Sequence, residues 1–211
     1  MIRYYSQRGA ELERNYERPE RQADLSLLKQ SVQTLVNGEA VFELAAGTGY
    51  WTQLISTVCK SMIALDASAE MLAIARTKKY SKNVSFVRGD VYALPILRQS
   101  VHAIVGGFWW SHIPRERLLQ FLNGVHSIAL PGSKVVWFDN RFVSGNNTDI
   151  SRKDEYENTY QMRKLDDEQF EVIKNFPDEH EIRNAVGNVN EFSFQQSEYY
   201  WLASYRLFSH P

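Results

Sequence analysis

The sequence predicts an α/β fold: a doubly wound, mostly parallel seven-stranded sheet with helices on both faces. Between residues 40 and 140, short apolar runs alternate with segments whose apolar residues recur at helical spacing. Strands that alternate with helices in this way form parallel sheets covered on both faces. A glycine-rich turn, Gly47-Thr48-Gly49, joins the first run to a helical segment. Two strand-like runs near the C-terminus are expected to complete the sheet as an antiparallel pair.

The composition limits the possible partners. The chain has 211 residues, with 24 basic and 25 acidic side chains and a net charge of −1. This length predicts one domain, residues 1–211, and this charge predicts no general attraction to nucleic acid or to an anionic membrane. Cys59 is the only cysteine, so no intrachain disulfide can form. The N-terminus lacks the apolar region of a signal peptide, and no apolar run is long enough to span a bilayer. We therefore expect a cytoplasmic monomer or homodimer that holds no metal ion.

Residues 1–38 are expected to form an N-terminal helical lid and a helix. The stretch from Tyr4 to Arg21 is polar and contains several tyrosines, which is more typical of a lid than of a core. Apolar residues at helical spacing follow from Leu25 to Val36, and Asn37-Gly38 supplies a helix stop.

Residues 39–140 are expected to form the central core. Ser68 is placed to cap a helix that runs to Arg76. A longer helix is expected to end at the turn Leu130-Pro131-Gly132. Strands are predicted at residues 40–45, 61–66, 84–88, 101–107 and 134–138.

The pattern changes after the fifth strand. Residues 141–177 are predicted to be an insertion, with a polar loop over 141–156 and a hairpin formed by 159–165 and 170–175. In residues 178–211, Asp178 and Glu181 have the spacing of a capping box for a helix that ends near Gly187. The runs 191–196 and 199–207 are expected to pair as a final antiparallel hairpin.

The glycine turn predicts a ligand that approaches the backbone closely. A nucleoside triphosphate loop would need Gly-Lys-Ser/Thr, whereas Tyr50-Trp51 follows Gly49. A dinucleotide fingerprint needs a small residue three positions after Gly49, and Thr52 stands there. The dinucleotide reading is thus weakened but stays open at this point.

The segment Glu43-Leu44-Ala45-Ala46-Gly47-Thr48-Gly49 resembles the first motif of class I S-adenosylmethionine-dependent methyltransferases, with Ala45 in place of the first glycine. Asp66 ends the second strand, about 20 residues past the glycines, where an acid takes ribose hydroxyls. Asp90-Val91 follows the third strand, where the resemblance places the adenine contacts. Leu130-Pro131-Gly132 is similar to the Pro-Gly turn of this family, and the match runs in order from Ala40 to Asp139.

The resemblance implies a Rossmann-like methyltransferase fold in which residues 39–140 bind S-adenosyl-L-methionine (SAM) and release S-adenosyl-L-homocysteine (SAH). The residues expected to bind this cofactor are Glu43, Ala45, Gly47, Thr48, Gly49, Trp51, Asp66, Ala67, Met71, Asp90 and Val91.

The end of the fourth strand carries the evidence about the methyl acceptor. The segment from Phe108 to Pro114 lacks the Asn/Asp-Pro-Pro-aromatic motif of enzymes that methylate amino groups of bases or glutamine. It resembles the small-molecule methyltransferases of ubiquinone and menaquinone biosynthesis, whose corresponding segment often carries a histidine. We therefore expect His112 to be the general base, with kcat/KM rising through a pKa of about 6–7. A role in orienting the next helix is the alternative for His112.

Further acceptor contacts are expected from the aromatic run, the end of the fifth strand, the inserted hairpin and the N-terminal lid. The residues expected to bind the acceptor are Tyr5, Phe108, Trp109, Trp110, Asp139, Tyr160 and Arg163; Tyr4 and Tyr16 are expected to belong to the lid.

The sequence thus predicts methyl transfer from SAM to a small, partly apolar molecule by in-line displacement. A nucleic-acid methyltransferase is one alternative, but segments such as Arg115-Glu116-Arg117 mix charges of both signs where a basic stripe would be needed. A non-catalytic SAM-binding protein is the other, since binding residues alone do not establish turnover.

Overall fold

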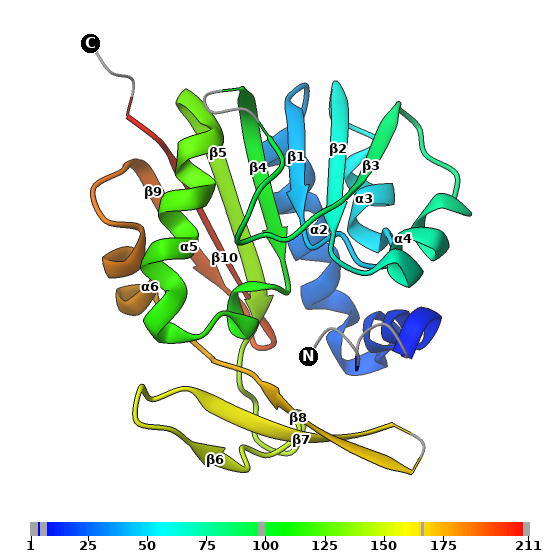
Figure 1. Cartoon of the computed structure of the whole chain (residues 1–211), viewed down its shortest axis with the longest axis vertical. Helices are drawn as coiled ribbons and strands as arrows, with labels where there is room; N and C mark the ends of the chain where they lie inside the picture. Colours follow the sequence, from blue (N-terminus) through cyan, green and yellow to red (C-terminus); the bar gives the residue numbers. More distant parts are fainter. Residues whose placement is uncertain (1–3, 5–7, 97–99, 166, 209–211) are drawn as a thin grey trace.

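The computed structural model describes residue 4 and residues 8–96, 100–165 and 167–208. Its centre is a seven-stranded sheet with the order β3-β2-β1-β4-β5-β10-β9 (Figure 1). Strands β1 to β5 are parallel, while β10 pairs antiparallel with both β5 and β9. The strands are β1 (Ala40–Leu44), β2 (Ser61–Asp66), β3 (Val84–Arg88), β4 (Val101–Gly107), β5 (Ala129–Asn140), β9 (Asn190–Gln196) and β10 (Tyr200–Arg206). The predicted fold class is confirmed.

Two hydrophobic layers cover the sheet because side chains alternate between its faces along each strand. Phe42 of β1 and Ile104 of β4 face the layer that contains α5 (Arg115–Ile128) and α6 (Glu179–Val186). Val41 and Val105, their neighbours in sequence, face the layer that contains α2 (Gln22–Val36) and α3 (Tyr50–Ile55). A further helix, α4 (Ala69–Arg76), begins at Ser68, whose hydroxyl accepts a hydrogen bond from the amide of Met71 as predicted.

Strand β5 begins earlier than predicted. Helix α5 ends at Ile128 and β5 starts at Ala129, so Leu130-Pro131-Gly132 lies inside the strand and does not form a turn before it. The pairing with β4 shifts register here, from Val101 opposite Ala129 to Ala103 opposite Lys134. In the irregular stretch, Gly132 donates to the carbonyl of Leu207 and the carbonyl of Ser133 accepts from the amide of Leu207. A bulge of this kind retains the direction of the strand while it absorbs the proline, which cannot donate.

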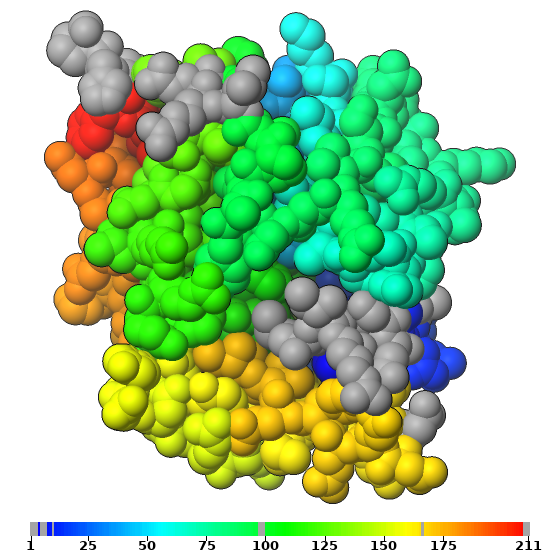
Figure 2. Space-filling model, viewed as in Figure 1, coloured from blue at the N-terminus to red at the C-terminus, as the bar shows by residue number. Residues whose placement is uncertain are grey.

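The insertion after β5 forms a second, three-stranded sheet of β6 (Arg152–Lys153), β7 (Thr159–Leu165) and β8 (Glu168–Ile173). The hairpin of β7 and β8 was predicted, whereas the two-residue β6 was not. Figures 1 and 2 show this sheet, in yellow and orange, against the carboxyl edge of the main sheet below α5. Buried asparagines hold it there: Asn175 donates to the carbonyl of Ile113 over 3.0 Å, and the amide of Arg115 donates to Asn158 over 2.8 Å.

The N-terminal segment lies at the same edge (Figure 1). Its described residues include the short 3-10 helices η1 (Gly9–Tyr16) and η2 (Pro19–Arg21), which precede α2. The ring of Tyr4 lies 5.4 Å from that of Phe170 on β8, so the two added segments touch. The capping box of Asp178 and Glu181 is present at α6. In the described residues, no helix is long and apolar enough to cross a membrane.

Candidate active site

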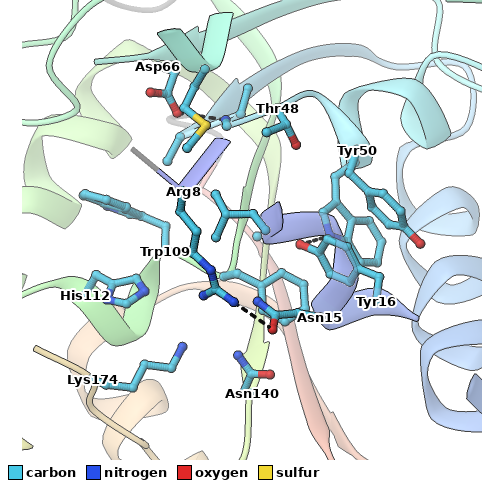
Figure 3. Close-up of a pocket in the computed structure, with 18 of the residues that line it drawn as sticks. Arg8, Asn15, Tyr16, Thr48, Tyr50, Asp66, Trp109, His112, Asn140 and Lys174 are labelled. Atoms are coloured by element: carbon cyan, nitrogen blue, oxygen red, sulfur yellow. Dashed lines mark hydrogen bonds between the residues drawn. The ribbon is translucent and has the colours of Figure 1, made fainter. Parts of the chain in front are cut away.

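A cavity of about 480 Å³ lies at the carboxyl ends of β1, β2 and β4, between the sheet edge, the N-terminal segment and the insertion. Strands β2 and β4 lie on either side of β1, so the strand order reverses at this point, where open α/β sheets bind their ligands. Figure 3 shows Asp66 and Thr48 at one end of the cavity and His112, Lys174 and Asn140 at the other, with Arg8 between them. We call these the cofactor end and the acceptor end.

At the cofactor end, the carboxylate of Asp66 organises the glycine turn. It accepts hydrogen bonds from the amide of Gly47 and from the amide of Ser68, both over 2.8 Å. Burial raises the pKa of Asp66 while these amide donors lower it. Each carboxylate oxygen has a second lone pair, so Asp66 can still accept hydrogen bonds from a ribose. Gly47 has a φ of 57° and nothing within 4 Å of where a Cβ would lie, which leaves the turn open to a ligand.

The other two positions of the motif have different roles. Gly49 was expected to approach the ligand, but it does not line the cavity. A Cβ there would lie 2.5 Å from the Tyr80 hydroxyl and 3.0 Å from the Ala75 Cβ, and its φ of 80° also favours glycine. Gly49 therefore serves the packing of α3 on α4. Ala45, at the position of the motif's first glycine, has a φ of 52° and adopts the left-handed conformation without being glycine.

Two further carboxylates line the cofactor end. Glu43 is 3% exposed and accepts a hydrogen bond of 2.5 Å from Thr52, and burial raises its pKa to about 8. Asp90 accepts a hydrogen bond of 2.9 Å from the amide of Tyr92. The side chain of Arg117 stacks 3.9 Å from the centre of the Tyr92 ring, which closes this end of the cavity.

All the predicted cofactor residues except Gly49 line the one cavity. They are Glu43, Ala45, Gly47, Thr48, Trp51, Asp66, Ala67, Met71, Asp90 and Val91. Their arrangement provides carboxylates for hydroxyl and amino groups beside an open backbone turn, which suits the adenosine part of SAM.

At the acceptor end, a buried polar cluster surrounds His112. Lys174 is buried, and its amino group lies 2.9 Å from Asp139 and 2.6 Å from the Ser111 hydroxyl. The second oxygen of Asp139 accepts from the amide of Ser111 over 3.0 Å. Burial lowers the pKa of Lys174, whereas the positive charge of Lys174 lowers the pKa of Asp139. At this distance and degree of burial, Lys174 and Asp139 form a buried ion pair.

The imidazole of His112 has a defined tautomer. Its Nδ1 lies 2.7 Å from the carbonyl oxygen of Ile173, which can only accept, so Nδ1 carries the proton and Nε2 carries the lone pair. Burial and the charge of Lys174 lower the pKa of His112 to about 3. The ring is therefore neutral at physiological pH, and the expected pKa of 6–7 is wrong for the unliganded protein.

Only some of the residues predicted to bind the acceptor line the cavity. Phe108, Trp109, His112 and Arg163 line the cavity. Trp110 does not, because its indole is buried between Trp137 and Trp201, with ring centres 5.5 and 6.1 Å away. Asp139 is fully buried behind Lys174 and does not reach the cavity surface.

The remaining predictions concern tyrosines of the insertion and of the N-terminal segment. Tyr160 does not line the cavity; its hydroxyl donates to Asp154 over 2.8 Å, and Arg152 stacks on its ring. In this structure its contacts therefore lie within the inserted sheet and not at the acceptor end of the cavity. Tyr5 lies outside the described residues. Tyr16 lines the cavity as a lid residue, stacked 4.0 Å from Tyr50 and accepting a hydrogen bond from the Trp51 indole.

Several polar residues that were not predicted from the sequence also line the acceptor end, among them Arg8, Asn15, Arg21, Asn140, Asn146 and Lys174. Arg8 and Arg21 come from the N-terminal segment, Asn140 from the end of β5, and Lys174 from just after β8. No motif links these positions. Only the prediction that both added segments cover the cleft pointed to them.

Comparison with known proteins agrees with this geometry. A family model described as a methyltransferase domain matches residues 41–132. An uncharacterized methyltransferase of Oceanobacillus iheyensis is 27% identical over 172 residues, which cover 79% of this chain and 76% of that protein. The demethylmenaquinone methyltransferase of Lactococcus lactis is 33% identical over 107 residues, and this match covers 48% of this chain and 42% of that enzyme.

A solved structure similar over nearly the whole chain is the DhpI–SAH complex, with a TM-score of 0.80 and 25% identity over 99% of this chain and 96% of DhpI. The DhpI–SAM–HEP complex has a TM-score of 0.78 and 26% identity over 97% of this chain and 95% of that one. A methyltransferase domain match, methyltransferase relatives and cofactor-bound neighbours thus agree with the carboxylates and open turn of the cofactor end. The chain is a class I S-adenosylmethionine-dependent methyltransferase, with SAM as its cofactor.

Proposed function

We propose that the enzyme methylates a small, partly apolar molecule bound at the acceptor end of the cavity. The observation that carries this proposal is that one cavity of about 480 Å³ joins the cofactor end to a second lobe with its own polar groups. This volume is typical of small-molecule sites. Phe108, Trp109 and Tyr16 supply apolar walls, and His112 and Lys174 supply polar groups in the same lobe.

The reaction in this site is an in-line displacement. A lone pair of the acceptor attacks the methyl carbon, and the electron pair of the S–CH₃ bond returns to sulfur, so the positive sulfonium becomes a neutral thioether. Alignment of the acceptor with this bond supplies most of the rate enhancement. If the acceptor atom carries a proton, that proton must leave as the new bond forms.

We propose His112 as the group that takes this proton through Nε2. The hydrogen bond from Nδ1 to Ile173 holds the ring in the tautomer that a base requires. The lowered pKa keeps the base form populated, although it makes the unliganded ring a weak base. A negatively charged ligand beside the ring would raise the pKa of His112 and strengthen it as a base.

The test is to offer methyl-labelled SAM with separated fractions of a cell extract: a low-mass filtrate, total RNA, DNA and protein. We expect label to enter a compound of the low-mass filtrate, and this labelling should be lost in Asp66→Ala. Label in RNA, DNA or protein, with none in the filtrate, would overturn the proposed acceptor class but not the assignment as a methyltransferase.

A further inference from the structure

We propose that the methyl acceptor carries an oxyanion, a carboxylate or phosphate-type group, which is bound by Arg21, Arg8 and Lys174 at the acceptor end of the cavity. This inference rests on the proposed function and narrows the substrate to an anionic metabolite with a partly apolar remainder.

Arg21 provides the principal observation. Its side chain lines the cavity, yet the residue is only 7% exposed. Its guanidinium donates to Asn146 over 2.7 Å and to Asn140 over 3.4 Å, both neutral oxygens. Within the described residues it forms no ion pair. Glu20, which is exposed and accepts a hydrogen bond from Asn146, acts on Arg21 only from beyond ion-pair distance. A buried guanidinium without a directly contacting counter-charge is costly, and an anionic ligand in the cavity would supply one.

Arg8 lies in the middle of the cavity (Figure 3), and no carboxylate of the described residues forms an ion pair with it. Its guanidinium contacts the Tyr4 hydroxyl over 3.2 Å and the Asn15 side chain over 3.4 Å. Both distances are long for hydrogen bonds, and both partners are neutral. The guanidinium therefore retains donors for a ligand, since it has five N–H groups.

Other donors converge on the same lobe. Lys174 points into it (Figure 3), with one negative partner in Asp139, and Arg163 also lines it. An oxyanion has several lone pairs and could satisfy such a set of donors, whereas a neutral apolar ligand would leave them unpaired.

Acidic side chains are distributed unevenly between the two ends of the cavity. The carboxylates that line the described cavity are Glu43, Asp66 and Asp90, all at the cofactor end. At the acceptor end Arg8, Arg21 and Lys174 line the cavity; in the described residues the acids beside them are Asp139, buried and paired with Lys174, and Glu20, which is exposed and accepts a hydrogen bond from Asn146. The lobe therefore carries more basic than acidic groups, inside a chain whose net charge is −1. The hydrogen bonds from Arg21 to Asn140 and Asn146 do not by themselves require a charged side chain, because a neutral donor could also make them.

The experiment measures anion binding by calorimetry to enzyme saturated with SAH, in a zwitterionic buffer at constant chloride. Inorganic phosphate and acetate are the two probes, and glycerol and acetamide are neutral controls. We expect millimolar or tighter binding of at least one oxyanion and none of the neutral probes. Tighter binding of phosphate would indicate that the acceptor carries a phosphate-type group, and tighter binding of acetate would indicate a carboxylate.

Variants locate the site. Arg21→Gln and Arg8→Gln should each weaken the bound oxyanion roughly tenfold or more, as expected for a lost charge-assisted hydrogen bond, with SAH affinity kept within about threefold. Arg206→Gln is the matched control, because Arg206 is paired with Glu191 at the far edge of the sheet. Arg21→Lys, which keeps the charge, should recover part of the binding if Arg21→Gln unfolds.

Three outcomes would overturn the inference: neither oxyanion binds the SAH complex, the neutral probes bind equally well, or Arg8→Gln and a folded Arg21→Gln bind the oxyanion as the control does. Each leaves the proposed function standing if a low-mass compound still gains the methyl label. Failure of SAH itself to bind would instead refute the methyltransferase site.

Discussion

The two ends of the cavity are built in different ways. The cofactor end comes from short segments that follow β1, β2 and β3, and its predicted residues fall between Glu43 and Val91; Gly47 and Asp66, which are hydrogen-bonded, lie 19 positions apart. The acceptor end comes from four distant places: the N-terminal segment, the turn after β4, the end of β5 and the insertion. A local motif can therefore specify the cofactor, whereas the acceptor is specified by segments that only the tertiary fold brings together.

The largest expected effect is on catalysis at the acceptor end. His112→Ala should lower turnover by about 10²–10⁴-fold, the range for loss of a general base, while SAH affinity remains near wild type. His112→Asn should be nearly as poor, because an amide cannot take the proton. If His112→Asn keeps near-full activity, His112 only orients its neighbours, and the acceptor end does not supply a general base.

The same residue predicts a pH profile. Because the pKa of His112 is lowered to about 3, the ring stays in its base form above that pH. Since kcat/KM reports the free enzyme, it should show no rise from His112 between pH 6 and 8. An inflection is expected only in kcat, because a bound anion raises the pKa of the ring. A kcat/KM inflection near 6.5 that disappears in His112→Asn would contradict this account.

Lys174→Met should be the most destabilising change at the acceptor end. It leaves the fully buried carboxylate of Asp139 without its partner, and breaking a buried pair costs about 3–5 kcal/mol. Chemical denaturation should show this loss in the free energy of unfolding, and Lys174→Met combined with Asp139→Asn should recover part of it. Exposed Lys153→Met, which breaks a surface pair with Glu157, is the control and should cost about 1 kcal/mol or less.

Asp66→Ala should act on the cofactor end alone. It removes the acceptor for the amides of Gly47 and Ser68 and the carboxylate facing a ribose, so SAH affinity should fall more than tenfold by calorimetry. Oxyanion binding at the acceptor end should change much less. An exposed carboxylate variant, Asp149→Ala, is the control. Tighter binding of NADH than of SAH by the wild type would refute the cofactor assignment.

The smallest effect is expected at Ala45. Glycine would relieve its left-handed conformation but would also gain entropy in the unfolded chain. These terms oppose each other, so Ala45→Gly should change the free energy of unfolding by about 1 kcal/mol or less. Ala45→Val should be worse, because a β-branched residue is strained at this φ. A large loss on Ala45→Gly would show that the Ala45 methyl group packs against the cofactor site.

The sequence predicted most of the fold because its strands are short apolar runs with clear boundaries. The bounds of β2, β3 and β4 agree with prediction. The start of β5 could not be predicted, because Pro131 and Gly132 have the composition of a turn although they lie inside the strand, where Gly132 donates to the carbonyl of Leu207, just after β10. Strand β6 has only two residues and carries no periodic signal.

Site residues could be predicted where they lie next to a recognisable strand, and could not be predicted where distant segments supply them. Asp66 and Asp90 were found because each follows a recognisable strand. Gly49 was assigned to the ligand although its packing against Tyr80 decides its identity, and Trp110 was assigned to the acceptor although its indole fills the core. Arg21 and Lys174 are 153 positions apart in the sequence, and no pattern in either segment indicates that both side chains enter one cavity.

The most direct test of the two-ended cavity is a crystal structure of the SAH complex. We expect the ribose to lie at the Asp66 carboxylate, the adenine to lie near Asp90 and Val91, and the sulfur to point toward Trp109 and His112 with the cationic lobe beyond it. A complex in which the ribose lies away from Asp66, or in which the sulfur points away from His112 and the lobe of Arg8, Arg21 and Lys174, would contradict it.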